Sequence, residues 1–168
     1  VSAVGHDCAR EVTTGSHNTA VGQGCLDSCT TGKENVSMGH GAANDITSGD
    51  ENVIFGTRAG GYNVPLTSGS RNILIGRDAY TSSASATHQI VIGTYQTGGK
   101  GNSTGYINPN GGAMYQGNNG THWTTNSDRR IKKNIVDNTT GLAKINQIKV
   151  KNFEYKTEDE IKTNSPEL

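Results

Sequence analysis

The chain has 168 residues, of which 31% are hydrophobic and 5% aromatic, and 23 are glycine, so it is poorly suited to the core of an ordinary monomeric globular domain. Fifteen basic and fifteen acidic residues give zero net charge, which implies no general attraction to nucleic acid or to anionic membranes. No apolar run approaches the roughly 18 residues of a membrane span. A chain of this kind is disordered, stacks repeats, or is an obligate oligomer.

A short apolar segment that ends in glycine recurs through the first part of the chain. The motifs SAVG, TAVG, VSMG, VIFG, ILIG and IVIG end at Gly5, Gly22, Gly39, Gly56, Gly76 and Gly93, with spacings of 17, 17, 17, 20 and 17 residues. The pattern predicts a mainly β fold, a parallel β-solenoid (β-roll) of 17-residue repeats over residues 1–96. The three extra residues fall in YNVPL, where we expect a loop to bulge outward.

Further columns in the same register predict the inside of the solenoid. An amide precedes every motif but the first, at Asn18, Asn35, Asn52, Asn72 and Gln89, and we expect these side chains to stack into a ladder. Small and apolar residues form two core columns, namely Cys8, Cys25, Ala42, Ala59 and Ala79, and Val12, Cys29, Ile46 and Leu66. The glycine after each strand permits a tight corner with positive φ.

Several residues that could suggest chemistry fit the repeat instead. All three cysteines fall in core columns, so we expect free, buried thiols. His6 and His17 share their columns with variable polar residues, which indicates outward positions, and we expect no metal or cofactor. A threonine column, Thr13, Thr30, Thr47 and Thr67, leaves an ice-binding solenoid as a remote alternative. Turn chemistry is the better account, because the next column leads directly into a glycine turn.

The strands also bear on oligomeric state. In VIFG and ILIG three successive residues are apolar, so both faces of the strand require burial. We assign Ile54, Leu74 and Val91 to the face that meets another subunit. The repeat motif, of the form TTGxxNTAVGxxA, is similar to the repeats of phage tail fibres and of the heads of trimeric autotransporter adhesins. This resemblance covers residues 1–96 and implies a homotrimer.

Residues 97–126 lose the repeat and predict an irregular β tip or connection, rich in turn signals. Tyr106, Tyr115 and Trp123 hold most of the aromatic side chains there. They could form a platform for sugar, but packing within a trimeric tip is the preferred interpretation.

The composition changes abruptly at SDRRIKKNI, which begins at Ser127. Thr139 or Thr140 can cap a short helix, and VKNFEYK alternates like a strand, so we expect a small α+β segment. Residues 127–168 resemble the intramolecular chaperone auto-processing domain of phage tail spikes and fibres, the Ser/Lys self-cleaving peptidase family found in endosialidases. Its pattern SDxRLKxNI…FxY is matched, with Ile131 in place of leucine, and we expect only the N-terminal part of that domain to be present.

The resemblance implies a site. Ser127 would be the nucleophile and Lys132 its base, with cleavage between Asn126 and Ser127, while Asp128 and Arg130 match supporting positions. A lysine can act as a base when neighbouring cations lower its pKa, and three basic residues flank Lys132. Positions i and i+5 lie about 140° apart on a helix. Ser127 would therefore lie in a loop before the helix, or the two residues would meet across subunits.

These features together predict a tail fibre or spike protein of a virion, assembled in the host cytoplasm and used for host attachment. Its chaperone would drive trimerisation and release itself as a single-turnover serine endopeptidase. Expected partners are two further copies of the chain and a host polysaccharide or receptor, without nucleic acid or membrane insertion. The alternative is a bacterial trimeric adhesin head without proteolysis.

Overall fold

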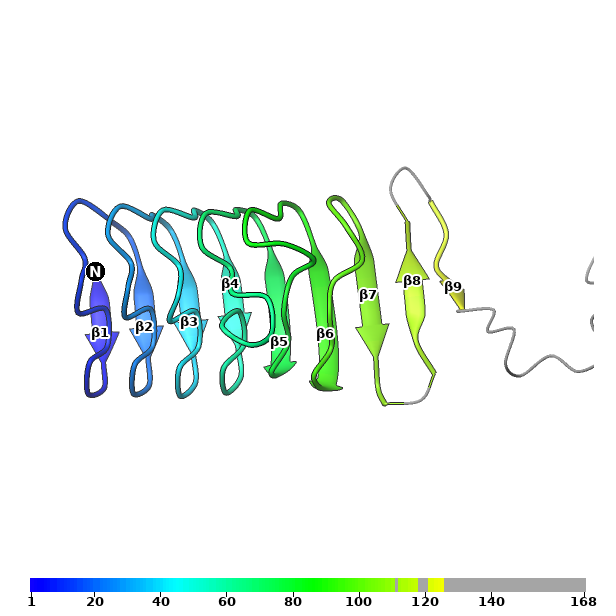
Figure 1. The fold of residues 1–168 in the computed structure, drawn as a ribbon, viewed down its shortest axis with the longest axis horizontal. Coiled ribbons are helices and arrows are strands. Elements are labelled where there is room, and N and C mark those ends of the chain that lie inside the picture. The colour runs from blue at the N-terminus through cyan, green and yellow to red at the C-terminus, as the bar shows by residue number, and fades with distance from the viewer. Residues whose placement is uncertain (111, 118–120, 126–168) are drawn as a thin grey trace, which may run out of the picture. The chain divides into compact units, whose positions relative to one another are not determined.

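The computed structural model describes residues 1–110, 112–117 and 121–125. Within these residues every regular element is a strand, and all strands join one sheet in chain order (Figure 1). The strands are β1 (Ser2–Val4), β2 (Thr19–Val21), β3 (Val36–Met38), β4 (Val53–Phe55), β5 (Ile73–Arg77), β6 (Ile90–Tyr95), β7 (Gly105–Asn108), β8 (Met114–Gln116) and β9 (Thr124–Thr125).

Strand pairing confirms the predicted parallel β-solenoid. Each strand from β1 to β6 pairs in parallel with the equivalent strand of the next coil, so that Ala3 lies beside Ala20 and Ile54 beside Leu74. The chain returns between strands through turns that bond to the next coil, as in the bond from the amide of Ala43 to the carbonyl of Ala59 at 2.8 Å. Most of these backbone groups are thus satisfied between coils, and some within a single turn, such as the amide of Ala42 by the carbonyl of Gly39.

The sheet changes character after β7. β7 pairs in parallel with β6, so the parallel ladder extends one strand beyond residue 96. β8 and β9 then pair antiparallel, as the turn-rich sequence of this region allows. Tyr106 is buried, and a side chain at Gly105 would collide with the Trp123 ring at 2.7 Å. Within this one chain, Tyr106 and Trp123 therefore contribute to packing.

The glycine corners have the predicted backbone conformation. Gly39 and Gly56 have φ values of 136° and 133°, which side chains rarely allow. A Cβ atom at Gly56 would also lie 2.5 Å from the carbonyl oxygen of Gly76 in the next coil. Glycine is therefore required here both by conformation and by the close stacking of coils.

The predicted amide ladder is present and buried. The side-chain oxygen of Asn35 accepts bonds from both the backbone amide and the side-chain amide of Asn52, each at 3.0 Å. The side-chain amide of Asn52 also donates to the carbonyl of Gly69 at 2.9 Å. The pattern repeats from Asn18 to Asn72. Gln89 ends it, because its longer side chain turns to Ser82 instead.

Both core columns are confirmed, but the strand face assigned to a neighbouring subunit is wrong. Ile54, Leu74 and Val91 are fully buried inside their own chain. The reason is the two-residue period of a strand, which places Ile54 on the same face as Asn52 two positions earlier. Since the amide ladder lies inside the solenoid, the central residue of each apolar triplet must lie inside as well.

The fourth coil adjusts its opposite side to these large strand residues. Gly60 occupies the return-segment position that Leu26 fills two coils earlier, and both positions are buried. A Cβ atom at Gly60 would lie 3.1 Å from Cδ1 of Ile54 and 3.6 Å from Cδ1 of Leu74. Small residues on the return segment thus compensate for larger ones on the strand, and the core stays filled without widening the coil.

Candidate subunit interface and processing site

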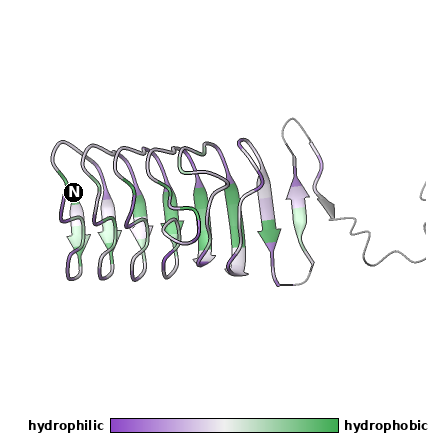
Figure 2. Ribbon diagram, in the orientation of Figure 1, coloured by the Kyte–Doolittle hydropathy of each residue, from purple (hydrophilic) through white to green (hydrophobic). Residues whose placement is uncertain are grey.

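An apolar face of the sheet points away from the core of the chain. We call it the outer face, and it consists of residues that flank the buried central position of each strand: Val21, Val36, Met38, Val53, Phe55, Ile73, Ile75, Ile90, Ile92 and Ile107. Hydrophobic colour is strongest on β4, β5 and β6 in Figure 2. A parallel sheet this apolar is normally covered on both sides.

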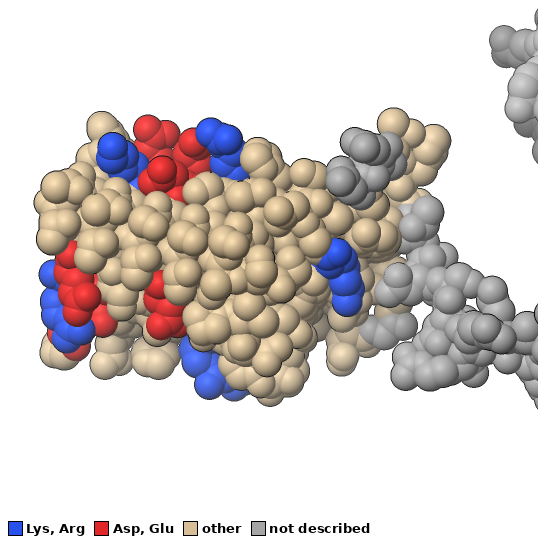
Figure 3. Space-filling model, turned by 45° about the horizontal axis from the view of Figure 1, so that its top comes forward, with Lys and Arg blue, Asp and Glu red and all other residues tan. Residues whose placement is uncertain are grey.

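No part of the described chain covers the outer face completely. Met38, Ile75 and Ile90 remain 52%, 36% and 39% exposed. A shallow apolar hollow of about 200 Å³ lies between Ile75, Ile92 and Ile107. Every outer-face residue named above is uncharged, whereas charged side chains of both signs gather in separate clusters elsewhere, as in the view of Figure 3. The outer face therefore has the character of a subunit interface rather than of a solvated surface.

A second feature, which the sequence pattern did not reveal, is a cluster of tyrosine and arginine side chains around the insertion of the fourth coil. Arg58 donates from Nε and Nη2 to the two carboxylate oxygens of Asp78, at 2.8 and 3.0 Å. Asp78 is fully buried, and its hydrogen bonds raise the pKa of the Arg58 guanidinium. The same guanidinium lies 5.2 Å from the ring centre of Tyr62 in the inserted loop.

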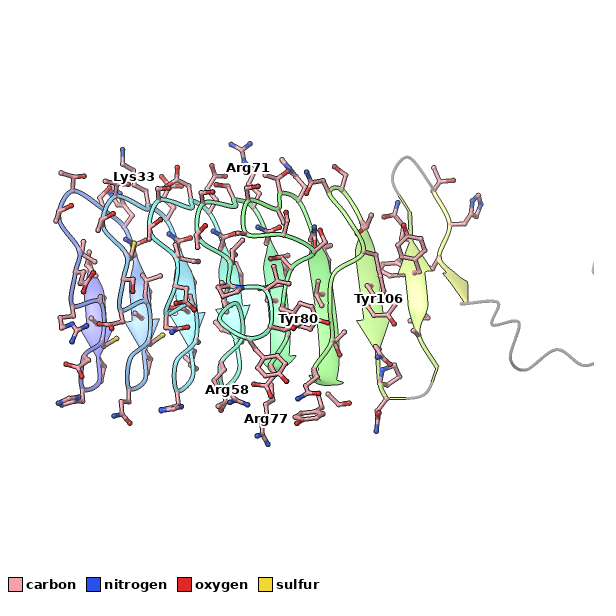
Figure 4. The ribbon with its side chains drawn as sticks, in the orientation of Figure 1. Lys33, Arg58, Arg71, Arg77, Tyr80 and Tyr106 are labelled. Carbon is pink, nitrogen blue, oxygen red and sulfur yellow. The ribbon has the colours of Figure 1, made fainter. Side chains whose placement is uncertain are left out.

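The cluster ties the inserted loop to the end of β6. Gln96 donates to the hydroxyls of Tyr62 and Tyr95, both at 2.8 Å, and Arg77 lies 5.2 Å from the Tyr95 ring centre. Arg58, Arg77 and Tyr80 lie around the same corner of the coils in Figure 4. Two features of the sequence could have indicated this cluster. One is the aromatic residue Tyr62 in the insertion, and the other is that Arg58 stands in the column where the preceding coil has Gly41.

The thiols and the threonine column have structural roles. Cys25 and Cys29 are buried and free, as predicted, while Cys8 is only half-buried. Burial raises the pKa of both Cys25 and Cys29. The Thr30 hydroxyl donates to the carbonyl of Thr47 in the next coil at 3.1 Å, and the other threonines repeat this bond. These hydroxyls therefore stabilise the turns, which is the role that the sequence pattern favoured over ice binding.

Two further properties of the described residues bear on function. None of their His, Cys, Asp and Glu side chains assemble in groups of three or more that could hold a metal ion. The described part of the chain also contains no helix long and apolar enough to span a membrane. His6 and His17 are exposed, as their columns predict.

The predicted processing site lies outside the described residues. This holds for the cleavage position Asn126–Ser127, for the base Lys132 and for the supporting residues Asp128 and Arg130. The expected helix and strand of residues 127–168 lie outside as well, so the geometry of the site stays a prediction. The last described strand, β9, ends at Thr125, one residue before the predicted cleavage bond.

The described residues define the first part of the chain as a parallel β-solenoid of about 17-residue coils. In the remainder, residues 127–167 match the family model of the chaperone of endosialidase. No curated protein and no solved structure matched the chain. The C-terminal segment is thus similar to that family, and the match begins at Ser127, the residue that the motif predicts to be the nucleophile.

Proposed function

We propose that this chain is the C-terminal region of a homotrimeric tail fibre or spike, in which the solenoid forms a shaft or tip for host attachment. Two observations together support this proposal: residues 127–167 match the chaperone family, and the outer face of the solenoid is apolar and uncovered. Three chains that share their outer faces would bury the residues that a single chain leaves in water.

A repetitive trimer of this kind needs assistance to assemble in register. Adjacent coils of the solenoid are alike, so a slip of one whole coil between chains exchanges similar outer-face residues, such as Val36 for Val53. Such slips differ little in energy, and long-range parallel pairing is slow. A chaperone that holds three chains at the correct register would remove this problem and could then be released.

The proposed release is a serine-mediated cut. The Ser127 hydroxyl oxygen attacks the carbonyl carbon of Asn126 while its proton passes to the amine of Lys132. The bond from that carbonyl to the Ser127 nitrogen breaks, the nitrogen takes the proton, and Asn126 becomes an ester on the serine oxygen. Water then hydrolyses the ester, which leaves a carboxyl end at Asn126 and restores the hydroxyl. Asp128 and Arg130 support this site.

The test is the intact mass of the full-length gene product, followed by N-terminal sequencing of its fragments. We expect a break between Asn126 and Ser127 in the parent chain and none in Ser127→Ala. Lys132→Ala should slow the break severely, whereas Lys133→Ala, the matched control, should do so much less. Cleavage that persists in Ser127→Ala would refute the mechanism. A parent chain that trimerises but never breaks would favour an adhesin head without proteolysis.

A further inference from the structure

A polar groove crosses the solenoid on the side of the corners and return segments, away from the outer face. Its volume is about 320 Å³, at the lower end of the range for small-molecule sites. The lining comes from the first four coils and includes Asp27, His40, Asn44 and Arg58. It ends at Gly61, the residue before Tyr62 of the insertion.

The floor of the groove exists because two side chains are missing. Gly24 and Gly41 occupy one column with Asp7, Arg58 and Asp78, and all five have φ values between 53° and 62°. The non-glycine members show that this backbone accepts side chains. A Cβ atom at Gly24 would meet nothing within 4 Å, and one at Gly41 would meet only Cγ of Arg58 at 3.7 Å. Neither backbone conformation nor packing therefore requires glycine here, and its effect is to leave open space.

The charges that line the groove are already balanced within the protein. Asp27 accepts a bond from Arg10 at 3.0 Å, Arg10 also lies 4.0 Å from Asp7, and Arg58 is paired with buried Asp78. Within the described part of the chain the second carboxylate oxygen of Asp27 accepts no bond, but this atom is buried, so the hydrogen-bonding groups that the groove exposes are other polar side chains of its lining, such as His40 and Asn44. The groove thus offers donors and acceptors of several kinds, without a net charge to recognise an ion.

An aromatic residue stands beside one end of this polar surface. Tyr62 follows the lining residue Gly61, and its ring is fixed by Arg58 on one side and by the hydroxyl bond from Gln96. A fixed aromatic ring presents an apolar surface together with a polar hydroxyl at low entropic cost. A neutral sugar has the complementary features, a C–H face and a rim of hydroxyls that both donate and accept.

We propose that the groove over Gly24 and Gly41 binds a neutral saccharide. The proposal rests on the attachment role proposed above and specifies its ligand class and its site. An acidic saccharide is disfavoured because Arg58 and Arg10, the nearby cations, are already neutralised by Asp78, Asp7 and Asp27.

The test uses saturation-transfer NMR and calorimetry on the full chain with maltotriose, diacetylchitobiose and methyl β-galactoside, and with sialyllactose as the acidic comparison. We expect at least one neutral sugar to bind. Gly24→Asn and Gly41→Asn, which fill the floor at a φ that asparagine tolerates, should weaken that binding roughly tenfold or more. Tyr62→Ala should weaken it as well.

The matched control is His17→Asn, which places the same residue at a φ of 59° on an exposed position outside the groove lining. It should leave binding unchanged, and circular dichroism should show all variants folded. Binding by none of the neutral sugars, binding only of sialyllactose, or undiminished binding in both filled variants would overturn the inference. Light scattering and cleavage assays on the same samples test the proposed function separately, since a processed trimer that binds no sugar would refute the groove alone.

Discussion

The inner and outer faces of β4, β5 and β6 are similarly apolar, yet the chain covers only one of them. Ile54, Leu74 and Val91 are fully buried, whereas Ile75 and Ile90 remain more than one third exposed. Hydrophobicity alone does not distinguish these faces, but the buried amide ladder does, because Asn52 and Ile54 are separated by the two-residue strand period. A polar residue with a fixed structural role can therefore orient a strand better than its apolar neighbours.

The comparison predicts the largest effect for a charge on the inner face. Leu74→Lys would place an ammonium group without a partner in the core of every chain, at a cost of more than about 4 kcal/mol. We expect loss of folded protein, measured as loss of the β-sheet circular dichroism signal and of resistance to protease. A folded Leu74→Lys chain that had merely dissociated would contradict the assignment of the inner face.

Removal of one amide from the ladder should have the next largest effect. Asn52→Ala would leave the backbone amide of Asn72 without its acceptor in a buried site, and would remove one of the two bonds that the side-chain oxygen of Asn35 accepts. We expect the free energy of unfolding to fall by about 3 kcal/mol, from denaturant titration. Glu34→Ala, an exposed position in the column just before the ladder, is the control and should change little.

A lysine on the outer face should weaken the association of the subunits rather than the fold of the single chain. Ile75→Lys adds a charge to a residue that already meets solvent in the single chain, so the coil itself should tolerate it. We expect the trimer to dissociate while the β-sheet signal persists at low temperature. An unchanged trimer mass for Ile75→Lys would show that the outer face is not the interface.

The smallest effect concerns the thiols. Burial raises the pKa of Cys25 and Cys29, so both should react with a thiol reagent more slowly than half-buried Cys8. Because the unfolded chain would lose these protons at lower pH than the folded chain, stability should decrease as the pH rises above the ordinary thiol pKa. Equal, rapid labelling of all three thiols in the native protein would contradict their assignment to the core columns.

The repeat made much of the fold predictable. Each coil has the same backbone path and the same inward and outward positions. The glycine corners, the ladder from Asn18 to Asn72 and the core columns could therefore be located from spacing alone. The sequence did not reveal the cluster around Tyr62, because its members come from three coils and meet only through the insertion. The groove was missed for a similar reason, since Gly24 and Gly41 come from different coils and their spacing does not show the open space above them. At the processing site, Ser127 and Lys132 depend on motif resemblance, and the family match at residues 127–167 supports the segment rather than the dyad's geometry.

The mass of the unmodified protein in solution tests the central claim most directly, because the uncovered outer face is explained here by two further copies of the chain. Multi-angle light scattering, performed across a range of protein concentrations, should give three times the 17.7 kDa mass of the uncut chain, or three times the mass of residues 1–126 once the chain has been cut. A mass of 17.7 kDa at every concentration would mean that the outer face stays exposed to water, and would contradict both the trimer and the fibre.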